Sequence, residues 1–490
     1  MERPACLGRN GKRMSYLDKN FPLMNDRPGS GRRVRAFLIG CVAGLVTTTA
    51  GMPGQAAAAD GPAAPPPTGE QPELLAAATP AADEALAADE ADAAAPAPEP
   101  QRTTKGREAA RDRDVRVKHW YDPIEFEITY TGEIWGNLDG GIRQDARYLD
   151  NLDLMLTVPS ESFGAEGGTF FFYVLHNNRT TLSDIVGDLQ VVSNIDNDRI
   201  WRIFEAWYEQ NFFSDRLSLK VGFMDLNAEF DAIEPAGLMI LSSHGIGPDF
   251  SQSGRSGPSI FPLSMAGVRV QFAPDEHFLL RFAAFDGAAG TRNHPRRAAL
   301  KLGNGEGALL VGEFDLTGKG GWHLAVGVWG YTARFSGIEE TLGLPAERHR
   351  GNNGLYAFLH GPLYHERGDD DQGLQGWIRF GIADGRINQL DQYVGAGLVY
   401  TGILPGRDAD QMGLAVAAAR NGDSFRRFAA LTGNPVEKRE VNVEFTYRIE
   451  ATDWLALQPD FQWVIHPGTD PALKNAFVAG LRFEIGFQLF

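Results

Sequence analysis

Side chains that can hydrogen-bond to hydroxyl groups recur at every second position in several stretches of the chain. Glu205, Trp207 and Glu209 form one such set, and Glu125 and Glu127 begin another. A spacing of two residues places side chains on one face of a β-strand. Carboxylates accept hydrogen bonds from hydroxyls, and an indole face packs against CH groups. Such a face suits the reversible recognition of a polyhydroxylated solute, and it equally suits simple solvation.

Motifs for covalent or metal chemistry are missing from the sequence. The ten histidines form no HExxH motif and no close set of metal ligands. Ser242, Ser243 and His244 are adjacent, but adjacency does not establish the geometry of a catalytic triad. The acidic residues 369–371 are more simply a solvated turn than a cation site. The sequence therefore predicts neither an enzyme nor a bound cofactor or metal.

The elements that must position the polar side chains are strands in which apolar and polar residues alternate. Phe126, Ile128 and Tyr130 share one parity, and Glu127 and Thr129 lie on the other. Amphipathic helical periodicity is scarce after residue 118, and no later stretch is long and apolar enough for a membrane helix. The predicted strands are 124–135, 145–158, 168–177, 200–210, 216–224, 265–273, 277–286, 307–315, 322–334, 354–360, 373–382, 390–400, 411–419, 439–449, 454–465 and 476–489.

The connections between these sixteen strands alternate in length. The segments that follow odd-numbered strands are often long, as in 178–199 and 225–264. Those after even-numbered strands are often short, as in 211–215 and 274–276, with 361–372 as an exception. Outer-membrane barrels have long extracellular loops and short periplasmic turns, whereas a soluble β-sandwich has no reason to keep this rhythm.

The N-terminal segment supports export from the cytoplasm. Arginines at 32, 33 and 35 precede the apolar run 36–50, which ends in small residues near Ala59. This pattern predicts a signal peptide within 1–59, with Met24 as the natural start. Cleavage there removes Cys6 and Cys41, so no disulfide is expected. It leaves 37 basic and 60 acidic residues, a formal charge of −23 that argues against nucleic acid as a partner.

The next segment, 60–118, has the composition of a disordered tail. Residues 61–100 contain 15 Ala, 9 Pro and eight acidic residues with no basic one, and 101–118 carry seven basic and three acidic residues. Such a stretch cannot bury enough apolar area to offset its chain entropy. It is predicted to be a solvated periplasmic tail, with a tether, cell-wall contact or plug as alternatives, followed by a barrel domain over 119–490.

Two further features favour a membrane barrel. Aromatic residues such as Trp135, Tyr208 and Trp454 fall near predicted strand ends, where barrels place aromatic girdles. The chain ends in Phe490 on an alternating strand, which is similar to the signal that the barrel-assembly machinery reads. The predicted fold is all-β: an antiparallel transmembrane β-barrel of about 16 strands with a disordered N-terminal tail, integral to the bacterial outer membrane.

Four stretches are similar in their local amino-acid sequence to one known family. YTGEIWGNLDGGIRQDARYLDNLDL (130–154), NIDNDRIWRIFEAWYEQNFFSDRLSLKVGFMDLNAEF (194–230), FPLSMAGVRVQFAPDEHFLLRFAAFDG (261–287) and AGLRFEIGF (479–487) resemble the OprB carbohydrate-selective porins. The resemblance covers roughly 120–490. It implies a sixteen-stranded barrel whose inward loops narrow a sugar-conducting pore, with 131–147 and 194–230 as the segments that form the constriction.

Strand parity then selects candidate pore-lining residues. In strand 200–210, Phe204 and Tyr208 are expected to face outward, which turns Glu205 and Trp207 inward, while Arg202 sits at an interface or marks a bulge. Arg269, Arg281 and Arg379 also point inward by parity. The loops add Arg143, Asn194, Arg199, Asp225 and Glu229, so that the predicted lining set is Glu133, Arg143, Arg147, Asn151, Asp153, Asn194, Arg199, Glu205, Trp207, Lys220, Asp225 and Glu229.

The resemblance implies passive, facilitated diffusion of mono- or disaccharides through a water-filled pore. Mixed charges that face each other across the pore would favour dipolar neutral solutes over ions. For any single residue of the set, a structural role in the wall is the simpler interpretation. The alternatives are a general porin without sugar preference, a barrel-embedded hydrolase that uses Ser243 or His244, or a cell-wall-anchoring protein. Outer-membrane lipid is an expected partner, and a homotrimer is a further possibility.

Overall fold

The computed structural model describes residues 124–178, 180–197, 200–288, 307–342, 348–366 and 369–489. These residues fall in a single compact unit. The predicted signal peptide, the 60–118 tail and Phe490 lie outside the described residues, as does the candidate Arg199.

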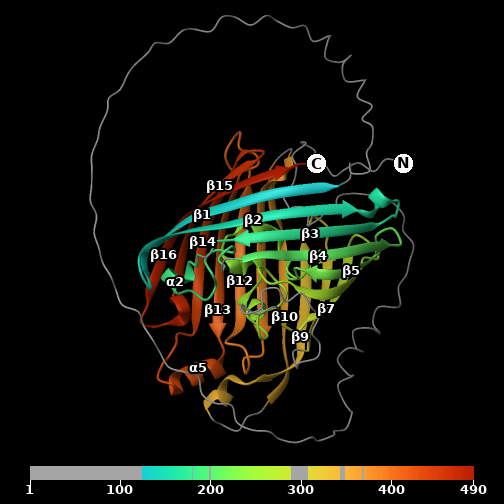
Figure 1. Ribbon diagram of the computed structural model, residues 1–490. Coiled ribbons are helices and arrows are strands. Elements are labelled where there is room, and N and C mark those ends of the chain that lie inside the picture. Colours follow the sequence, from blue (N-terminus) through green and yellow to red (C-terminus); the bar gives the residue numbers. More distant parts are fainter. Residues whose placement is uncertain are drawn as a thin grey trace, which may run out of the picture. The chain divides into compact units, whose positions relative to one another are not determined.

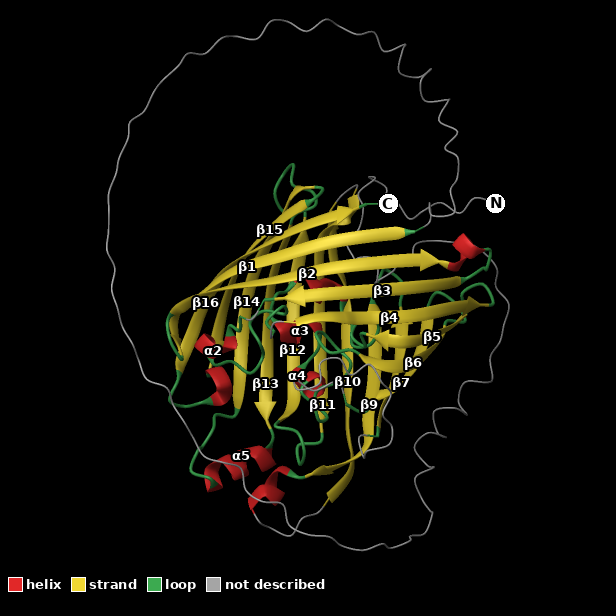
Figure 2. Ribbon diagram, in the orientation of Figure 1, coloured by secondary structure: helices red, strands yellow, loops and turns green. Residues whose placement is uncertain are grey.

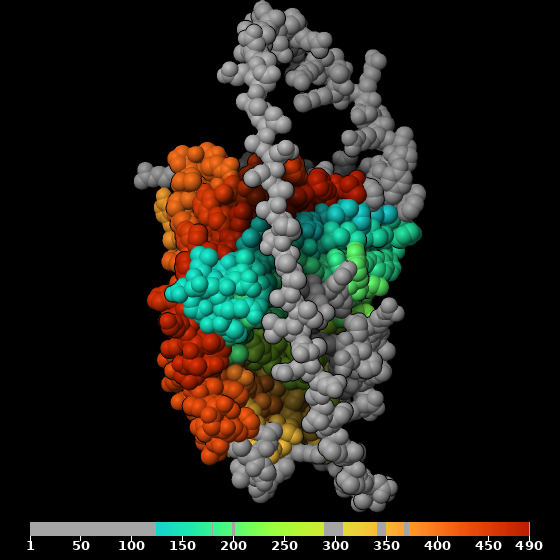
Figure 3. All heavy atoms as spheres, turned by 60° about the vertical axis from the view of Figure 1, so that its left-hand side comes forward, coloured from blue at the N-terminus to red at the C-terminus, as the bar shows by residue number. Residues whose placement is uncertain are grey.

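Sixteen strands form a closed barrel within these ranges, and each is antiparallel to both of its neighbours (Figures 1 and 2). The first strand pairs with the last, from Glu127 opposite Gln488 to Gly141 opposite Lys474, so the sheet has no edge. Figure 3 shows this closure as cyan atoms of the first strands against red atoms of the last. The strands are β1 (Glu125–Gly141), β2 (Asp145–Pro159), β3 (Gly168–Asn177), β4 (Ile200–Phe212), β5 (Leu217–Met224), β6 (Met265–Phe272), β7 (Phe278–Asp286), β8 (Ala308–Thr317), β9 (His323–Ser336), β10 (Arg348–Glu366), β11 (Asp369–Ala383), β12 (Leu390–Thr401), β13 (Gln411–Asn421), β14 (Arg439–Thr452), β15 (Leu455–Ile465) and β16 (Lys474–Gln488).

Alternation along each strand divides the barrel into two faces. In β9, Leu324, Val326 and Val328 are exposed on the outer face, whereas Ala325 and Trp329 are buried inside. The outer face is therefore a band of apolar side chains, as lipid contact requires. The prediction of sixteen two-faced strands is confirmed.

Two predicted connections are wrong, because the strands continue through them. The segment 136–144 was expected to be a loop, but β1 extends to Gly141 and pairs with β16 through two register shifts. Likewise 361–372 was expected to be a long turn, but β10 and β11 extend across most of it. A register shift between Pro362 and Tyr364 accommodates the proline, which cannot donate to the ladder.

A bulge in β4 overturns one predicted orientation. Val174 of β3 pairs with Ile203 and Tyr173 pairs with Glu205, so Phe204 is an extra residue. Phe204 was expected to face outward, but it is buried against Tyr173, with the two rings at a centroid distance of 5.1 Å. The alternation predicted for β4 therefore changes phase here, and of the two interpretations of Arg202, the bulge is confirmed.

Helices are few and short in the described residues, and none of them has the length and apolar character needed to cross a bilayer. They lie in the connections between strands. They are η2 (Ser160–Phe163), α2 (Ser183–Val186), η3 (Glu234–Leu238), α3 (Ser242–Gly245), α4 (Pro248–Ser251), η4 (Ile338–Leu342), α5 (Asp423–Leu431) and η5 (Pro467–Thr469).

The long connection 225–264 folds into the barrel and carries its own apolar core. Phe230, Met239 and Phe250 of this inward loop pack in one cluster with side chains of the inner wall. The Phe250 ring stacks on Trp329 of β9 at a centroid distance of 4.9 Å and an interplanar angle of 4°. The small residue Gly413 lets the loop approach, because a Cβ there would lie 2.2 Å from Met239 Cε. The loop thus fills part of the lumen (Figure 2).

Candidate functional site

A row of charged side chains runs across the inner wall from β4 to β8, with cations on β5, β6 and β7 and carboxylates on β4 and β8. Cross-strand pairing places Glu209 beside Lys220, Lys220 beside Arg269, and Arg281 beside Glu313. The pairs Glu209–Lys220 and Arg281–Glu313 join opposite charges, which stabilises the sheet and fixes these side chains along the wall. We call this set the charged row. It comprises Glu209, Lys220, Arg269, Arg281, Glu313 and Asp315.

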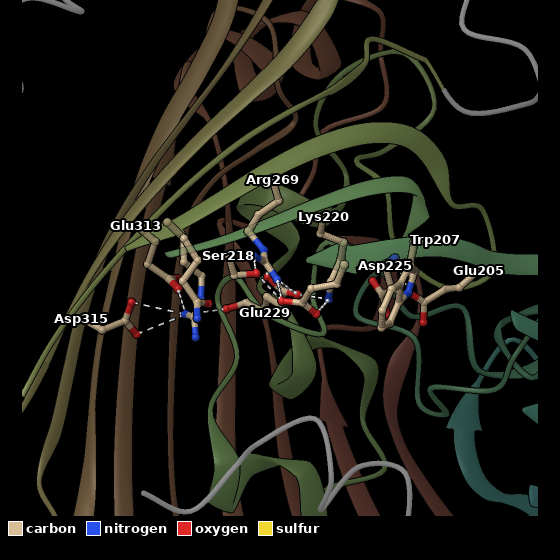
Figure 4. A network of polar contacts seen from close by, with 12 residues as sticks. Glu205, Trp207, Ser218, Lys220, Asp225, Glu229, Arg269, Glu313 and Asp315 are labelled. Carbon is tan, nitrogen blue, oxygen red and sulfur yellow. Dashed lines mark hydrogen bonds and ion pairs between the residues drawn. The ribbon is translucent and has the colours of Figure 1, made fainter. Parts of the chain in front are cut away.

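Glu229 of the inward loop joins the row to the loop (Figure 4). Its carboxylate forms an ion pair with Lys220 and accepts from Arg269 Nε at 2.5 Å and Nη2 at 2.9 Å. Its backbone carbonyl accepts from Arg281 Nη1 at 2.9 Å. Burial alone would raise the pKa of Glu229, but Lys220 and Arg269 outweigh burial and hold the pKa well below its usual range. Glu229 is therefore ionised at neutral pH.

An indole lies at one end of the row. The Lys220 ammonium sits 4.1 Å from the ring centroid of Trp207, a cation–π contact. Trp207 Nε1 donates to Glu205 Oε2 at 3.0 Å, and the same oxygen accepts the backbone N–H of Asp225 at 3.0 Å. Burial, together with the neighbouring Glu205, raises the pKa of Asp225. This end of the site thus places an aromatic face beside two carboxyl groups.

The other end of the row ties β7 and β8 to the loop. Arg281 Nη1 donates to Glu313 Oε1 at 2.9 Å and approaches Asp315 Oδ2 at 3.3 Å. Glu313 Oε2 also accepts from the hydroxyl of Tyr356 at 2.6 Å and from the backbone N–H of Asp231 at 2.8 Å. The middle of the row stays partly open to solvent: the side chains of Lys220, Glu209 and Glu229 are 11%, 21% and 17% exposed.

The inward loop is held on the opposite side by one arginine. Arg379 of β11 donates to Asp231 through Nε at 2.8 Å and Nη2 at 2.6 Å, and to Asp249 through Nη1 at 2.7 Å. Its side chain is only 1% exposed, and both carboxylates are fully buried. Gly247 is required beside this contact, since a Cβ there would lie 2.1 Å from Arg379 Nη1. The arginine therefore clamps two points of the loop to the wall.

Buried carboxylates and amides of β14 and β15 hold loop backbone. Glu444 accepts the N–H groups of Ile240 at 2.5 Å and Leu241 at 3.2 Å. Glu440 similarly accepts the backbone N–H groups of 189 and 190 in the connection 178–199. Gln458 and Gln462 donate to the carbonyls of Leu238 and Val192, both at 2.8 Å. Together with Arg379, which holds two loop carboxylates, these side chains hold the loops against the wall. We call this set the anchoring wall, and it comprises Arg379, Glu440, Glu444, Gln458 and Gln462.

The structure brings five of the predicted lining residues into one network. They are Glu205, Trp207, Lys220, Asp225 and Glu229, and Figure 4 shows them together with the charged row. They come from two strands and one loop.

A second predicted pair lies on the β1–β16 side of the barrel. Glu133 is fully buried and accepts from Trp135 Nε1, Ser193 Oγ and Arg482 Nε, each at 2.6 Å. Asn194 is exposed and accepts from Arg482 Nη2 at 2.5 Å. Arg482 thus links the two candidates and joins β16 to the connection 178–199.

The remaining candidates form local contacts along β2. Asn151 is buried and donates to Asp153 Oδ1 at 2.6 Å. Arg147 is half-buried and donates to Asp145 at 2.6 Å, and the exposed Arg143 reaches the same carboxylate at 3.4 Å. These contacts join Asn151, Arg147 and Arg143 to near neighbours rather than to the charged row.

Sequence reasoning left several members of the network out of the predicted set. Arg269 and Arg281 were placed inside by parity, and their burial and contacts confirm it. Glu313 and Asp315 were not singled out, because which strand position faces a cation depends on the cross-strand register. The available signal was their spacing of two residues in β8, which places both carboxylates on the same face of the strand.

Ser243 and His244 are not placed to act together. Ser243 Oγ donates to Gln190 Oε1 at 3.1 Å, and neither ring nitrogen of His244 has a hydrogen-bond partner among the described residues. Burial lowers the pKa of His244 to about 3, so the ring is neutral. The described residues also contain no group of three or more His, Cys, Asp or Glu side chains placed to hold a metal ion.

A closed barrel of sixteen antiparallel strands, with an apolar outer band and a lumen narrowed by an inward loop, defines an integral porin of the bacterial outer membrane. A family model described as "Carbohydrate-selective porin, OprB family" matches residues 143–487. The chain belongs to this family: it is a carbohydrate-selective porin, and hence a channel rather than an enzyme.

Individual relatives agree with this assignment. Porin B of Pseudomonas aeruginosa is 27% identical over 412 residues, which cover 74% of this chain and 87% of that protein. The putative porin QuiX of Acinetobacter baylyi is 21% identical over 402 residues, covering 74% and 89%. The fold is similar to the high-pH structure of Pseudomonas putida OprB, with a TM-score of 0.68, 22% identity and coverage of 74% of this chain and 94% of that one.

Proposed function

We propose that a neutral mono- or disaccharide crosses the narrow part of this porin along the charged row, between β4–β8 and the inward loop. The observation that carries the proposal is the partial exposure of Lys220, Glu209 and Glu229, which are otherwise held in fixed ion pairs. Fixed donors and acceptors can replace the water around sugar hydroxyls without having to reorganise. Trp207 adds an aromatic face at one end of the row.

The balance of charge favours neutral solutes over anions. The network contains six carboxyl groups, on Glu205, Glu209, Asp225, Glu229, Glu313 and Asp315, and three cations, on Lys220, Arg269 and Arg281. Each cation already contacts a carboxylate, so an anionic solute finds no uncompensated positive charge here. We therefore expect glucose to pass and block the pore more readily than gluconate.

The test measures the conductance of the purified porin in planar bilayers while glucose is added. Glucose should reduce the ionic current in a saturable way. Glu229→Gln should weaken this block by roughly tenfold, because it removes the carboxylate shared by Lys220 and Arg269. A matched control is Glu339→Gln, which removes a carboxylate from an exposed pair with Arg427 outside the network.

Sugar-independent conductance in the wild-type protein would contradict a sugar-binding row and leave only passage through a water-filled pore. Equal weakening of the block in Glu229→Gln and Glu339→Gln would show that the effect is not local to the row. Liposome swelling with glucose, gluconate and glucosamine then tests the predicted order of solutes, in which gluconate should be the slowest.

We also propose how the chain assembles, following its family resemblance and sequence. Residues 1–59 direct export, Phe490 is read by the barrel-assembly machinery, and three copies associate in the membrane. Deletion of Phe490 should lower the amount of folded protein in the outer membrane. Cross-linking in native membranes measures the oligomer, and a monomer alone would contradict the trimer.

Removal of 60–118 should leave liposome swelling unchanged if this tail does not plug the pore.

A further inference from the structure

Two histidines lie side by side on the inner wall, next to Asp315 of the charged row. His323 begins β9 and pairs in register with His360 of β10. Their neighbours Leu324 and Leu359 are exposed on the outer face, so both imidazoles point inward. His323 Nδ1 lies 2.8 Å from His360 Nε2. Two ring nitrogens thus face each other across a single pair of strands.

A carboxylate fixes the orientation of the first ring. His323 Nε2 lies 2.9 Å from Asp315 Oδ1 on β8. A carboxylate only accepts, so Nε2 carries the proton and Nδ1 presents its lone pair toward His360. Metal-bound histidines are oriented in this way, with the far nitrogen donating to a carboxylate. Asp315 is itself held by Arg281 at 3.3 Å, which keeps this partner in place.

The pair is accessible from one side and packed on the other. The His323 side chain is 24% exposed, whereas His360 is buried. The Phe358 ring lies 5.6 Å from the His323 ring and 6.1 Å from the His360 ring, and it supports both. Because His323 directly follows the short connection between β8 and β9, the pair sits at the end of the barrel where such turns lie, the periplasmic end.

We propose that His323 and His360 bind a divalent transition-metal ion such as Zn²⁺, and that the bound ion reduces conductance through the pore. Zn–N bonds of about 2.0–2.1 Å require ring nitrogens roughly 3 Å apart. In the metal-free pair His360 Nε2 donates to His323 Nδ1, so metal binding needs a small ring rotation and the transfer of the His360 proton from Nε2 to Nδ1. The described residues offer no third ligand here, and water completes the coordination shell. The bound ion adds positive charge beside Asp315, at the end of the charged row.

The experiment titrates the full-length porin in planar bilayers with ZnCl2 and measures the binding of Zn²⁺ by calorimetry. In the wild type, Zn²⁺ should lower the ionic current. Either His360→Gln or His323→Gln should weaken the apparent affinity at least about tenfold, and Asp315→Asn should weaken it by roughly tenfold. The matched control is His277→Gln, which removes an exposed histidine whose ring lies 3.1 Å from the Thr317 carbonyl and 3.9 Å from Glu276.

Equal Zn²⁺ affinity in the wild type and in the His323→Gln/His360→Gln double variant would overturn the proposal, and so would the absence of binding to the wild type. A measurement on the unmodified protein covers the case in which the variants do not fold. Cu²⁺ bound to the wild type should show hyperfine coupling to two imidazole nitrogens in electron paramagnetic resonance. Coupling to one nitrogen or none would also overturn it. Glucose block without metal should be unaffected by His360→Gln.

Discussion

The charged row and the anchoring wall use the same residue types for different ends. In the anchoring wall, Glu444 is fully buried and its acceptor oxygens are used by loop N–H groups. Glu209 of the charged row, and Glu229 that joins the row from the loop, pair with cations and keep part of their surface in solvent. A buried carboxylate that binds backbone holds a loop in place, and a partly exposed one remains available to a passing solute.

The difference follows from what lies against each wall. The inward loop packs its apolar side chains in one cluster with inner-wall residues of β5–β13, and Gly413 of β13 leaves room for Met239. At the charged row, the loop side chain Glu229 forms the ion pairs with Lys220 and Arg269. The loop therefore shields one wall from water and leaves part of the other facing the lumen.

Arg379→Met is expected to have the largest effect, because it breaks the anchoring wall at its main clamp. Asp231 and Asp249 would be left as buried carboxylates without their partner. Removing one member of a buried ion pair costs about 3–5 kcal/mol. We expect a lower unfolding temperature in detergent and a higher, noisier single-channel conductance, since the loop no longer stays against β11.

The comparison variant is Arg386→Met, which removes an arginine from a pair with Asp384 where the arginine is well exposed. It should change stability by less than about 1 kcal/mol. Similar destabilisation by both variants would contradict the role given to Arg379.

Glu444→Gln should have a smaller effect of the same kind. An amide oxygen still accepts from Ile240 or Leu241, but the NH2 group that replaces the second oxygen cannot accept a backbone N–H and must find a partner of its own. We expect a loss of about 1–3 kcal/mol in the free energy of unfolding. Glucose affinity should change far less than stability, because Glu444 lies in the anchoring wall. A selective loss of glucose block, with stability intact, would instead place Glu444 in the solute path.

Trp207→Leu tests the charged row and, in contrast to Glu444→Gln, should change the glucose block more than the stability. The substitution removes the ring under the Lys220 ammonium and the donor to Glu205. Such contacts are worth about 0.5–1.5 kcal/mol each. We expect a several-fold weaker glucose block with nearly unchanged thermal stability. Trp207→Phe should restore part of the block, because it keeps an aromatic face. Equal behaviour of the two variants would remove the aromatic face from the mechanism.

Acidification to pH 5 should leave the ion pairs of Glu229 with Lys220 and Arg269 intact. The pKa of Glu229 is lowered in the folded protein, so its ion pairs contribute stability that is present above the unfolded pKa of about 4.3. This contribution is lost only as the pH falls through the lower folded value. Glucose block measured from pH 7 to pH 5 should therefore stay constant. A loss of block near pH 6 that is absent in Glu229→Gln would contradict the assigned ionisation.

Much of the barrel was predictable because period-two alternation is a local property. All sixteen predicted strands exist, and most of their bounds agree with the structure within about two residues. The errors arose where pairing overrode composition, as at Pro362 in β10, where a register shift lets the strand continue. The bulge at Phe204 is of the same kind: only the pairing with β3 reveals the extra residue.

The sequence by itself determined which residues face inward on regular strands, that the chain forms an outer-membrane barrel, and which family it belongs to. The tertiary structure decided which inward residues meet. Lys220 and Glu229 are near in sequence, but Arg379 meets Asp231 and Asp249 across 148 and 130 residues. Such contacts depend on cross-barrel register and on the path of the loop, which no local periodicity encodes. The structure alone therefore separates a carboxylate that anchors a loop from one that faces the pore.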